Sequence, residues 1–234
     1  MMVDTGLFDM FSEALEYPLE GDDYTPLLIG SVLAFFSWLV IPAIILNGYY
    51  LSVIRTSYDG QRSPPQFEEW GDLFLTGLVG AIISIVYVFV PTVVFVAIFV
   101  LTGGTGVLLG GDAGLASFLG GVLIALLVSG VLYLVVWYVL PAALANYART
   151  DSIVAAFSPG QLKTILLNGD YAKAWVIALV IGLLGGFVMG FVNGLFGIVP
   201  ILGNIVALVI TIPISVFIGM AINHLYGIAV AKAI

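Results

Sequence analysis

Four long stretches of this sequence contain no charged residue, and they constrain the fold more than any other feature. No Asp, Glu, Lys or Arg occurs in residues 24–54, 73–111, 113–148 or 174–231. About 20 apolar residues are enough to span a bilayer as a helix. Because lipid offers the backbone no hydrogen bonds, a spanning segment must satisfy its own polar groups. We therefore expect an all-α, multi-pass membrane protein, a polytopic bundle of transmembrane helices.

The composition agrees with this fold class. Hydrophobic residues make up 62% of the 234 residues and charged residues only 9%, against roughly 25% charged residues in a soluble domain. The 14 acidic and 6 basic residues exclude a basic nucleic-acid-binding surface. The absence of cysteine excludes disulfides and thiol chemistry. The acid excess is typical of a halophilic, archaeal source, and the N-terminus has no basic stretch that would predict a cleaved signal peptide.

The apolar stretches divide into five predicted spans behind an N-terminal segment, residues 1–24. The spans cover about 26–54, 76–101, 115–147, 172–196 and 201–230, and all but the fourth contain a proline. Neighbouring helices can satisfy the carbonyl that a proline frees, so kinks are expected. Splitting the long first stretch would add a sixth span. The glycine-rich residues 103–114 predict a flexible loop or a short hairpin.

Amphipathic segments flank the spans. Residues 7–19 predict an amphipathic helix, either on the membrane surface or packed against the rest of the protein. The first long connection, 55–77, predicts an interfacial helix over 66–75, and the second, 149–175, predicts another beginning near Ser158. The residues expected to hold these helices at headgroup depth are Pro64, Pro65, Phe67, Trp70 and Trp175.

Two matching strings indicate an internal repeat, with chance similarity as the alternative. Residues 41–50 read IPAIILNGYY and residues 140–149 read LPAALANYAR. The alignment pairs Pro42 with Pro141 and Asn47 with Asn146. Within one transmembrane domain, 25–234, the repeat is parallel, because two spans separate its copies: module 1 covers about 25–101, module 2 about 115–196, and a last span, 201–230, follows. The asparagines are predicted to satisfy backbone groups freed by the prolines.

Lysine and arginine gather in alternate connections. They occur in 55–77, in and just after 149–171, and near the C-terminus, but not in the other two connections. Basic residues near span ends mark the cytoplasmic side. We therefore expect connections 55–77 and 149–171 and the C-terminus in the cytoplasm of a cell-membrane protein. With five spans the acidic N-terminus lies on the opposite side, and a sixth span would reverse that.

Glycine recurs at every fourth residue of GLLGGFVMGFVNG, residues 182–194. Helices in lipid associate by close van der Waals packing, which small residues permit. The recurring residues are Gly182, Gly186, Gly190 and Gly194. They predict a close-contact face, a glycine zipper, packed either against another span of the same chain or against a second copy in a homo-oligomer.

No pattern typical of catalysis or metal binding occurs. The sequence has no GxSxG, Walker or HExxH motif, so we expect neither enzymatic activity nor a metal or cofactor. No carboxylate, lysine or arginine lies well inside a span, which weakens an ion-coupled transporter. The polar residues that would line a passage if they converged are Asn193, Asn204, Asn223 and His224, with Thr211 and Ser215. The alternative for His224 is a hydrogen bond to a backbone carbonyl.

Several strings resemble a known membrane family. They are IPAIILNGYYLSVIRTSYDGQRSPPQFEEWGDLFLTGL, VLPAALANYARTDSIVAAF, NGDYAKAW and HLYGIAVAKA. The most specific elements are Gly48-Tyr49, the string from Pro64 to Trp70, and the string from Pro141 to Tyr147. The chain is similar to the archaeal domain-of-unknown-function family four-thousand-and-thirteen. The resemblance implies an integral membrane protein common in haloarchaea, and it implies no activity, cofactor or catalytic residue.

Three functions remain open at this point. The first is a non-enzymatic structural or scaffold protein that interacts with membrane lipid, self-associates through its glycine face and shapes the membrane with its interfacial helices. The second is a conduit for a small solute or lipid, which requires the polar residues to converge. The third is a membrane subunit of a larger complex.

Overall fold

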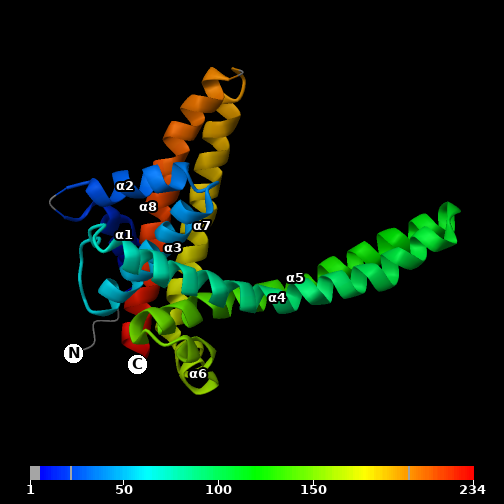
Figure 1. Cartoon of the computed structure of the whole chain (residues 1–234), viewed down its shortest axis with the longest axis horizontal. Coiled ribbons are helices and arrows are strands. Elements are labelled where there is room, and N and C mark those ends of the chain that lie inside the picture. The colour runs from blue at the N-terminus through cyan, green and yellow to red at the C-terminus, as the bar shows by residue number, and fades with distance from the viewer. Residues whose placement is uncertain (1–5, 22, 200) are drawn as a thin grey trace. The chain divides into compact units, whose positions relative to one another are not determined.

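The computed structural model describes residues 6–21, 23–199 and 201–234, without the side chains of residues 105 and 107. Residues 1–5 and 22 of the predicted N-terminal segment lie outside this description. The described residues form helices and no strand. The elements in chain order are α1 (Leu7–Glu16), η1 (Tyr17–Leu19), α2 (Thr25–Phe35), α3 (Val40–Tyr58), α4 (Trp70–Leu109), α5 (Gly111–Thr150), η2 (Ile153–Phe157), α6 (Pro159–Leu166), α7 (Gly169–Phe196) and α8 (Leu202–Ala233) (Figure 1).

Four of these helices are long and apolar enough to cross a membrane. They are Trp70–Gly104 of α4, Gly111–Thr150 (α5), Gly169–Phe196 (α7) and Leu202–Ala233 (α8). They correspond to the second to fifth predicted spans, which confirms the expectation of a multi-pass membrane protein. The helices continue through Pro91, Pro141 and Pro213 without a break.

The chain forms two compact units, one of residues 1–81 and 142–234 and one of residues 82–141. In the second unit α4 and α5 pack on each other. The Thr92 hydroxyl lies 2.8 Å from the Tyr133 hydroxyl, and the rings of Phe99 and Phe118 meet edge to face with centroids 5.9 Å apart. The functional residues discussed below lie in the first unit.

The first predicted span is divided into two helices, α2 and α3. The 11 residues of α2 extend only about 16 Å at 1.5 Å per residue, too short to cross the hydrocarbon core. α2 begins beyond Tyr17, which stacks on His224, and places Gly30 against Val216, so it runs toward the N-terminal part of α8. α3 then returns, with Ile54 against Gly227 near the end of α8.

This hairpin brings the N-terminal segment to the same end of α8 as the first connection. The Tyr17 hydroxyl donates to the Ser63 carbonyl at 3.5 Å. The N-terminal segment and the first connection therefore lie together, whereas a five-span arrangement puts them on opposite sides of the membrane. The number of spans and the side of the N-terminus stay predictions.

Two local predictions are wrong. No separate interfacial helix forms over 66–75: residues 60–69 are irregular and α4 begins at Trp70, so the predicted helix is the first part of the span itself. Residues 103–114 are not a loop, because α4 continues to Leu109 and α5 begins at Gly111. A Cβ on Gly106 would lie 2.6 Å from Gly114 O, so these glycines allow the two backbones to approach while remaining helical.

The N-terminal helix packs on the protein with one face. Met10 and Ala14 of α1 are buried, and α1 contacts α7 and α8. Phe8 on the other face is 77% exposed. The structure therefore agrees with the alternative in which the amphipathic helix is packed against the rest of the chain. The short helix predicted near Ser158 is present as α6, with Leu162 and Ile165 buried.

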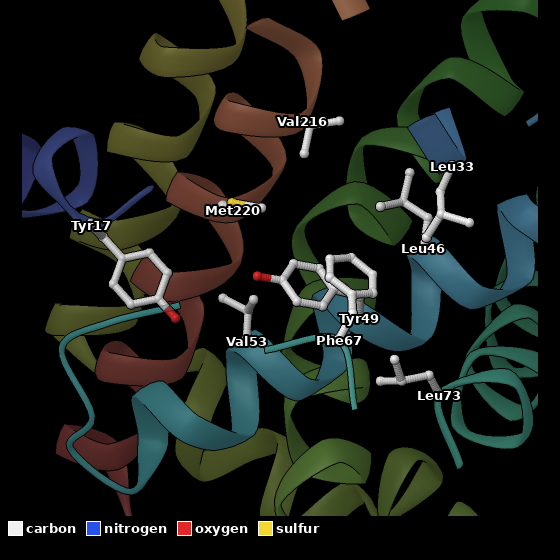
Figure 2. Packing of buried hydrophobic residues seen from close by; sticks show 9 residues of the cluster. All are labelled: Tyr17, Leu33, Leu46, Tyr49, Val53, Phe67, Leu73, Val216 and Met220. Atoms are coloured by element: carbon white, nitrogen blue, oxygen red, sulfur yellow. The ribbon is translucent and has the colours of Figure 1, made fainter. Parts of the chain in front are cut away.

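A hydrophobic core joins the N-terminal segment, the α2–α3 hairpin, the start of α4 and α8. Its buried members are Tyr17, Leu33, Leu46, Tyr49, Val53, Phe67, Leu73, Val216 and Met220 (Figure 2). The Tyr49 and Phe67 rings stack with centroids 4.0 Å apart and planes inclined by 10°. This core fixes the irregular connection before α4 against α3 and thereby positions the polar residues around His224.

Candidate functional site

The predicted glycine zipper of α7 meets no other described part of its unit. It consists of Gly182, Gly186, Gly190 and Gly194. A Cβ built on any of them would meet no described atom within 4 Å. α7 packs on α8 through Gly185 instead, where a Cβ would overlap the Ile218 side chain. Within the described part of its own unit the glycine face therefore has no packing partner, and both internal packing and association with a second copy stay predictions.

A ridge of large apolar side chains runs beside this glycine face. Its members each follow one of the glycines: Leu183, Phe187, Phe191 and Leu195. They are exposed, from 53% for Leu195 to 74% for Phe187. α7 therefore presents a groove and a ridge with the same four-residue repeat, and ridges of this repeat pack into the grooves of a neighbouring helix.

Two other glycines hold α3 and α4 together. A Cβ on Gly48 would overlap the Leu73 carbonyl, and a Cβ on Gly77 would overlap the Ile44 carbonyl. At the same crossing the Asn47 side chain donates to Gly77 O over 2.9 Å. Sequence reasoning missed this contact, because neither glycine belongs to a regular repeat and the partners come from different helices.

The predicted polar lining does not form a common site. Asn193 and Asn204 are exposed, and Asn193 donates to a carbonyl of its own helix. Asn223, Thr211 and Ser215 likewise donate to carbonyls of α8 itself. Polar groups that are satisfied within their own helix need no aqueous passage. The convergence that a conduit requires is therefore not observed among these residues.

His224 forms a buried contact with two distant segments. Its Nδ1 lies 2.7 Å from Ser57 Oγ of α3, and the His224 residue is only 3% exposed. Its ring stacks on Tyr17 with centroids 3.8 Å apart. The alternative of a hydrogen bond to a backbone carbonyl is therefore wrong. Because no described carboxylate bonds to the other ring nitrogen, Nε2, the pair lacks the orienting group of a hydrolase triad.

An acidic cavity of about 360 Å³ lies beside His224. Its lining is Asp9, Ser12, Glu13, Glu16, Glu20, Arg62 and His224. Four carboxylates face one guanidinium, so the lining is strongly acidic. Within the described residues no group of three or more His, Asp or Glu side chains is arranged to hold a metal ion. Burial raises the pKa of the adjacent Tyr17 hydroxyl, which keeps it neutral.

The two asparagines of the predicted repeat bind the segments that follow their helices. Asn146 is fully buried, and its side-chain nitrogen lies 2.7 Å from Ala155 O and 2.8 Å from Gln161 Oε1. Its oxygen accepts from Arg149. Asn47 similarly reaches α4. The prediction that these residues satisfy carbonyls freed by Pro42 and Pro141 is therefore wrong, although both amides do satisfy backbone carbonyls.

The C-terminal ends of α3 and α5, the two helices of the predicted repeat, bind each other. Arg55 of α3 donates from Nε to Ala148 O at 2.7 Å and forms an ion pair with Asp151. In return, Arg149 of α5 lies over the Tyr58 ring, 5.7 Å from its centroid. Each repeated helix thus supplies an arginine to the other. No pattern in the sequence indicated this exchange, because the partners lie more than 90 positions apart.

The predicted interfacial anchors divide into buried and exposed residues. Phe67 is 7% exposed and stacks on Tyr49, so its predicted role as a headgroup anchor is wrong. Pro64 is buried and Pro65 half-buried. Trp70 is 45% exposed and Trp175 is half-buried, and their roles at the interface stay predictions.

Comparison with known proteins gives a family but no assigned activity. No curated protein and no solved structure matches the chain. The family described as "Protein of unknown function (DUF4013)" matches residues 35–194, more than half of the chain. The matched region contains the α3–α4 glycine crossing, both repeated asparagines and the α7 glycine face. The chain belongs to the DUF4013 family.

Proposed function

We propose that the protein is a non-enzymatic membrane scaffold that self-associates through the glycine zipper of α7. The observation that carries this proposal is the empty glycine face in the middle of an apolar candidate span. In a helix interior, glycine is less favourable than alanine by about 1 kcal/mol. Close helix contact in lipid offsets that cost, and along this face α7 makes no such contact with the described residues of its own unit.

The shape of α7 favours a second copy of the same chain as the partner. The ridge containing Phe187 and Phe191 has the same repeat as the groove containing Gly186 and Gly190. In a two-fold symmetric pair both copies contribute the same face of α7. The ridge of each helix can then fill the groove of the other helix. The face needs no charged partner, because no charged residue lies in residues 174–231.

We further propose how the chain crosses the membrane. The four long helices cross, and the α2–α3 hairpin enters and leaves on one side. This arrangement gathers Arg55, Arg62, Arg149 and Lys232 on the same side, which the distribution of basic residues assigns to the cytoplasm. This arrangement leaves connections 55–77 and 149–171 on the predicted cytoplasmic side. It places the N-terminal segment on the same side. Helix α6 then lies in the cytoplasmic leaflet, where it would promote curvature.

Molecular mass in a lipid environment tests the self-association. The full chain is purified in mild detergent and its protein mass is measured by light scattering. We expect an oligomer for the unaltered protein and a monomer for the double variant G186L/G190L, because leucine fills the groove. The expected weakening of association is at least about tenfold, or ~1.4 kcal/mol.

Gly130→Leu provides the matched control. Gly130 lies in α5, inside another candidate span, and a Cβ there also meets nothing within 4 Å, but no four-residue glycine repeat surrounds it. The control is expected to keep the oligomer. A monomeric unaltered protein would overturn the proposal, and an oligomer that persists in G186L/G190L would show that another surface, or another chain, makes the contact.

A further inference from the structure

We propose that the connection between α7 and α8 inserts among the lipids of the far leaflet instead of projecting into water. This inference rests on the proposed crossing of the four long helices. The connection reads GIVPILG, residues 197–203, and its described residues, 197–199 and 201–203, form the α7–α8 tip. The self-association proposed above makes no use of this tip.

The surface of the α7–α8 tip is apolar. Ile198 is 77% exposed, Ile201 73% and Leu202 69%. No Asp, Glu, Lys, Arg, Trp or Tyr occurs in residues 176–225. An exposed apolar patch marks a protein or membrane interaction site. Because this patch continues the exposed apolar surface of two candidate spans, lipid is the partner that already surrounds it.

The length of α7 agrees with an end in the far headgroup layer. Lys173 pairs with Asp170 at the other end of α7, over 3.4 Å, and marks the near surface of the bilayer. Residues 174–196 then extend about 35 Å at 1.5 Å per residue. That length exceeds the ~30 Å of the hydrocarbon core but not the roughly 40–45 Å of the whole bilayer. The exposed amides of Asn193 and Asn204 beside the tip agree with headgroup depth, because an amide is costly among acyl chains.

The backbone of the tip forms hydrogen bonds within the turn. Gly197 N donates to Asn193 O at 2.8 Å. Val199 N donates to Phe196 O at 3.1 Å, and the Val199 carbonyl accepts from Gly203 N at 3.0 Å. The two helices also meet closely here, because a Cβ on Gly203 would overlap the Phe196 carbonyl. An unpaired backbone group is costly where water is scarce, so a closed turn suits a place among lipids better than an open loop.

The connection between α4 and α5, which the proposed crossing also assigns to the far side, has a different composition. It carries Asp112, which is exposed, and a carboxylate is costly in the apolar layer. The neighbouring Ala113 is exposed as well. We expect this connection to reach the aqueous phase, and it therefore provides a matched control within the same protein.

Cysteine labelling in intact cells that express the full-length protein tests the inference, because the chain contains no cysteine of its own. Val199→Cys, at a position that is 52% exposed, and the control Ala113→Cys are each treated from outside with a membrane-impermeant maleimide. We expect at least about tenfold slower labelling at position 199, because the reaction needs the thiolate and apolar surroundings disfavour it. Both thiols should react alike in denaturant. Equal rates at the two positions in intact cells would overturn the insertion.

A second measurement identifies what covers the tip. A nitroxide attached to Val199→Cys in phosphatidylcholine vesicles should relax faster with dissolved oxygen, which enters lipid, than with a water-soluble nickel chelate. The reverse order would show water at the tip, and protection from both reagents would show a second protein; either result would overturn the inference. Labelling of Ala113→Cys only after the cytoplasmic side is opened would overturn the proposed crossing, and this inference with it.

Discussion

The glycines at the α3–α4 crossing and those along α7 occupy opposite environments. At Gly48 and Gly77 a Cβ would overlap the backbone of the facing helix, whereas along the α7 zipper it would meet no described atom within 4 Å. The glycines with regular four-residue spacing on α7 thus have no described neighbour. The glycines without such spacing, Gly48 and Gly77, make the close helix contact. Four-residue spacing identifies a smooth helix face, but it does not identify what covers that face.

A second difference accompanies the first. The α3–α4 crossing also contains a hydrogen bond between helices, from Asn47 to Gly77 O. On α7 the nearby Asn193 donates to its own helix. The α3–α4 crossing therefore combines close approach of the two backbones with a hydrogen bond between the helices. The glycine face of α7 has no hydrogen-bonding side chain of its own and can bind a partner helix only by close packing. If a second copy covers α7, we expect the contact to depend on packing alone.

Gly77→Ala should have the largest effect. The added methyl group would overlap the Ile44 carbonyl, so α3 and α4 must separate. We expect a loss of about 3 kcal/mol in the free energy of unfolding, measured by denaturant unfolding in detergent. Gly71→Ala, near the start of the same helix and with open space around its Cβ, should be neutral or slightly stabilising. Equal effects of the two changes would contradict the close crossing.

Asn146→Leu should have the next largest effect. The Asn146 amide is fully buried and bonds to Ala155 and Gln161, so its removal leaves those acceptors without a donor. We expect a loss of about 2 kcal/mol in unfolding free energy. Asn193→Leu removes an amide that bonds only to its own helix and should change stability by less than about 0.5 kcal/mol. A loss at Asn193 as large as at Asn146 would indicate a partner that the single chain does not contain.

The double variant G186L/G190L should have the smallest effect on folding. Both positions are open, and leucine is a better helix residue than glycine, so the unfolding free energy of the monomer should stay the same or rise by up to about 1 kcal/mol per site. The same variant is expected to lose the oligomer. A variant that unfolds instead would show that α7 packs against its own chain through this face.

Much of the fold was predictable from the lengths of the uncharged stretches alone. α5, α7 and α8 lie where the apolar stretches predicted spans, because an uncharged stretch of that length in lipid has few alternatives to a helix. A split of the first stretch was expected only as an alternative, and its place was not predicted. Residues 36–39, FSWL, contain neither proline nor glycine, but Pro42 lies in the first turn of α3, where a missing N–H is tolerated, and the hairpin packs on α8.

The polar site was predictable only in part. His224 was identified as the one histidine, but its partners Ser57 and Tyr17 come from segments far away in the sequence. The acids of α1 come together with Arg62 and His224 only in the folded chain. Long-range pairings of this kind depend on tertiary packing, which periodicity does not report.

Cross-linking through a cysteine at position 190 tests the central claim most directly. The chain contains no cysteine, so Gly190→Cys introduces the only thiol, and Val188→Cys places one on the opposite side of α7, where Val188 is also exposed. A disulfide requires the two Cα atoms to lie within about 7 Å. We predict a covalent dimer for Gly190→Cys and none for Val188→Cys when membranes containing the full-length protein are oxidised. Absence of the dimer at position 190 would show that lipid, or a different chain, covers the glycine face.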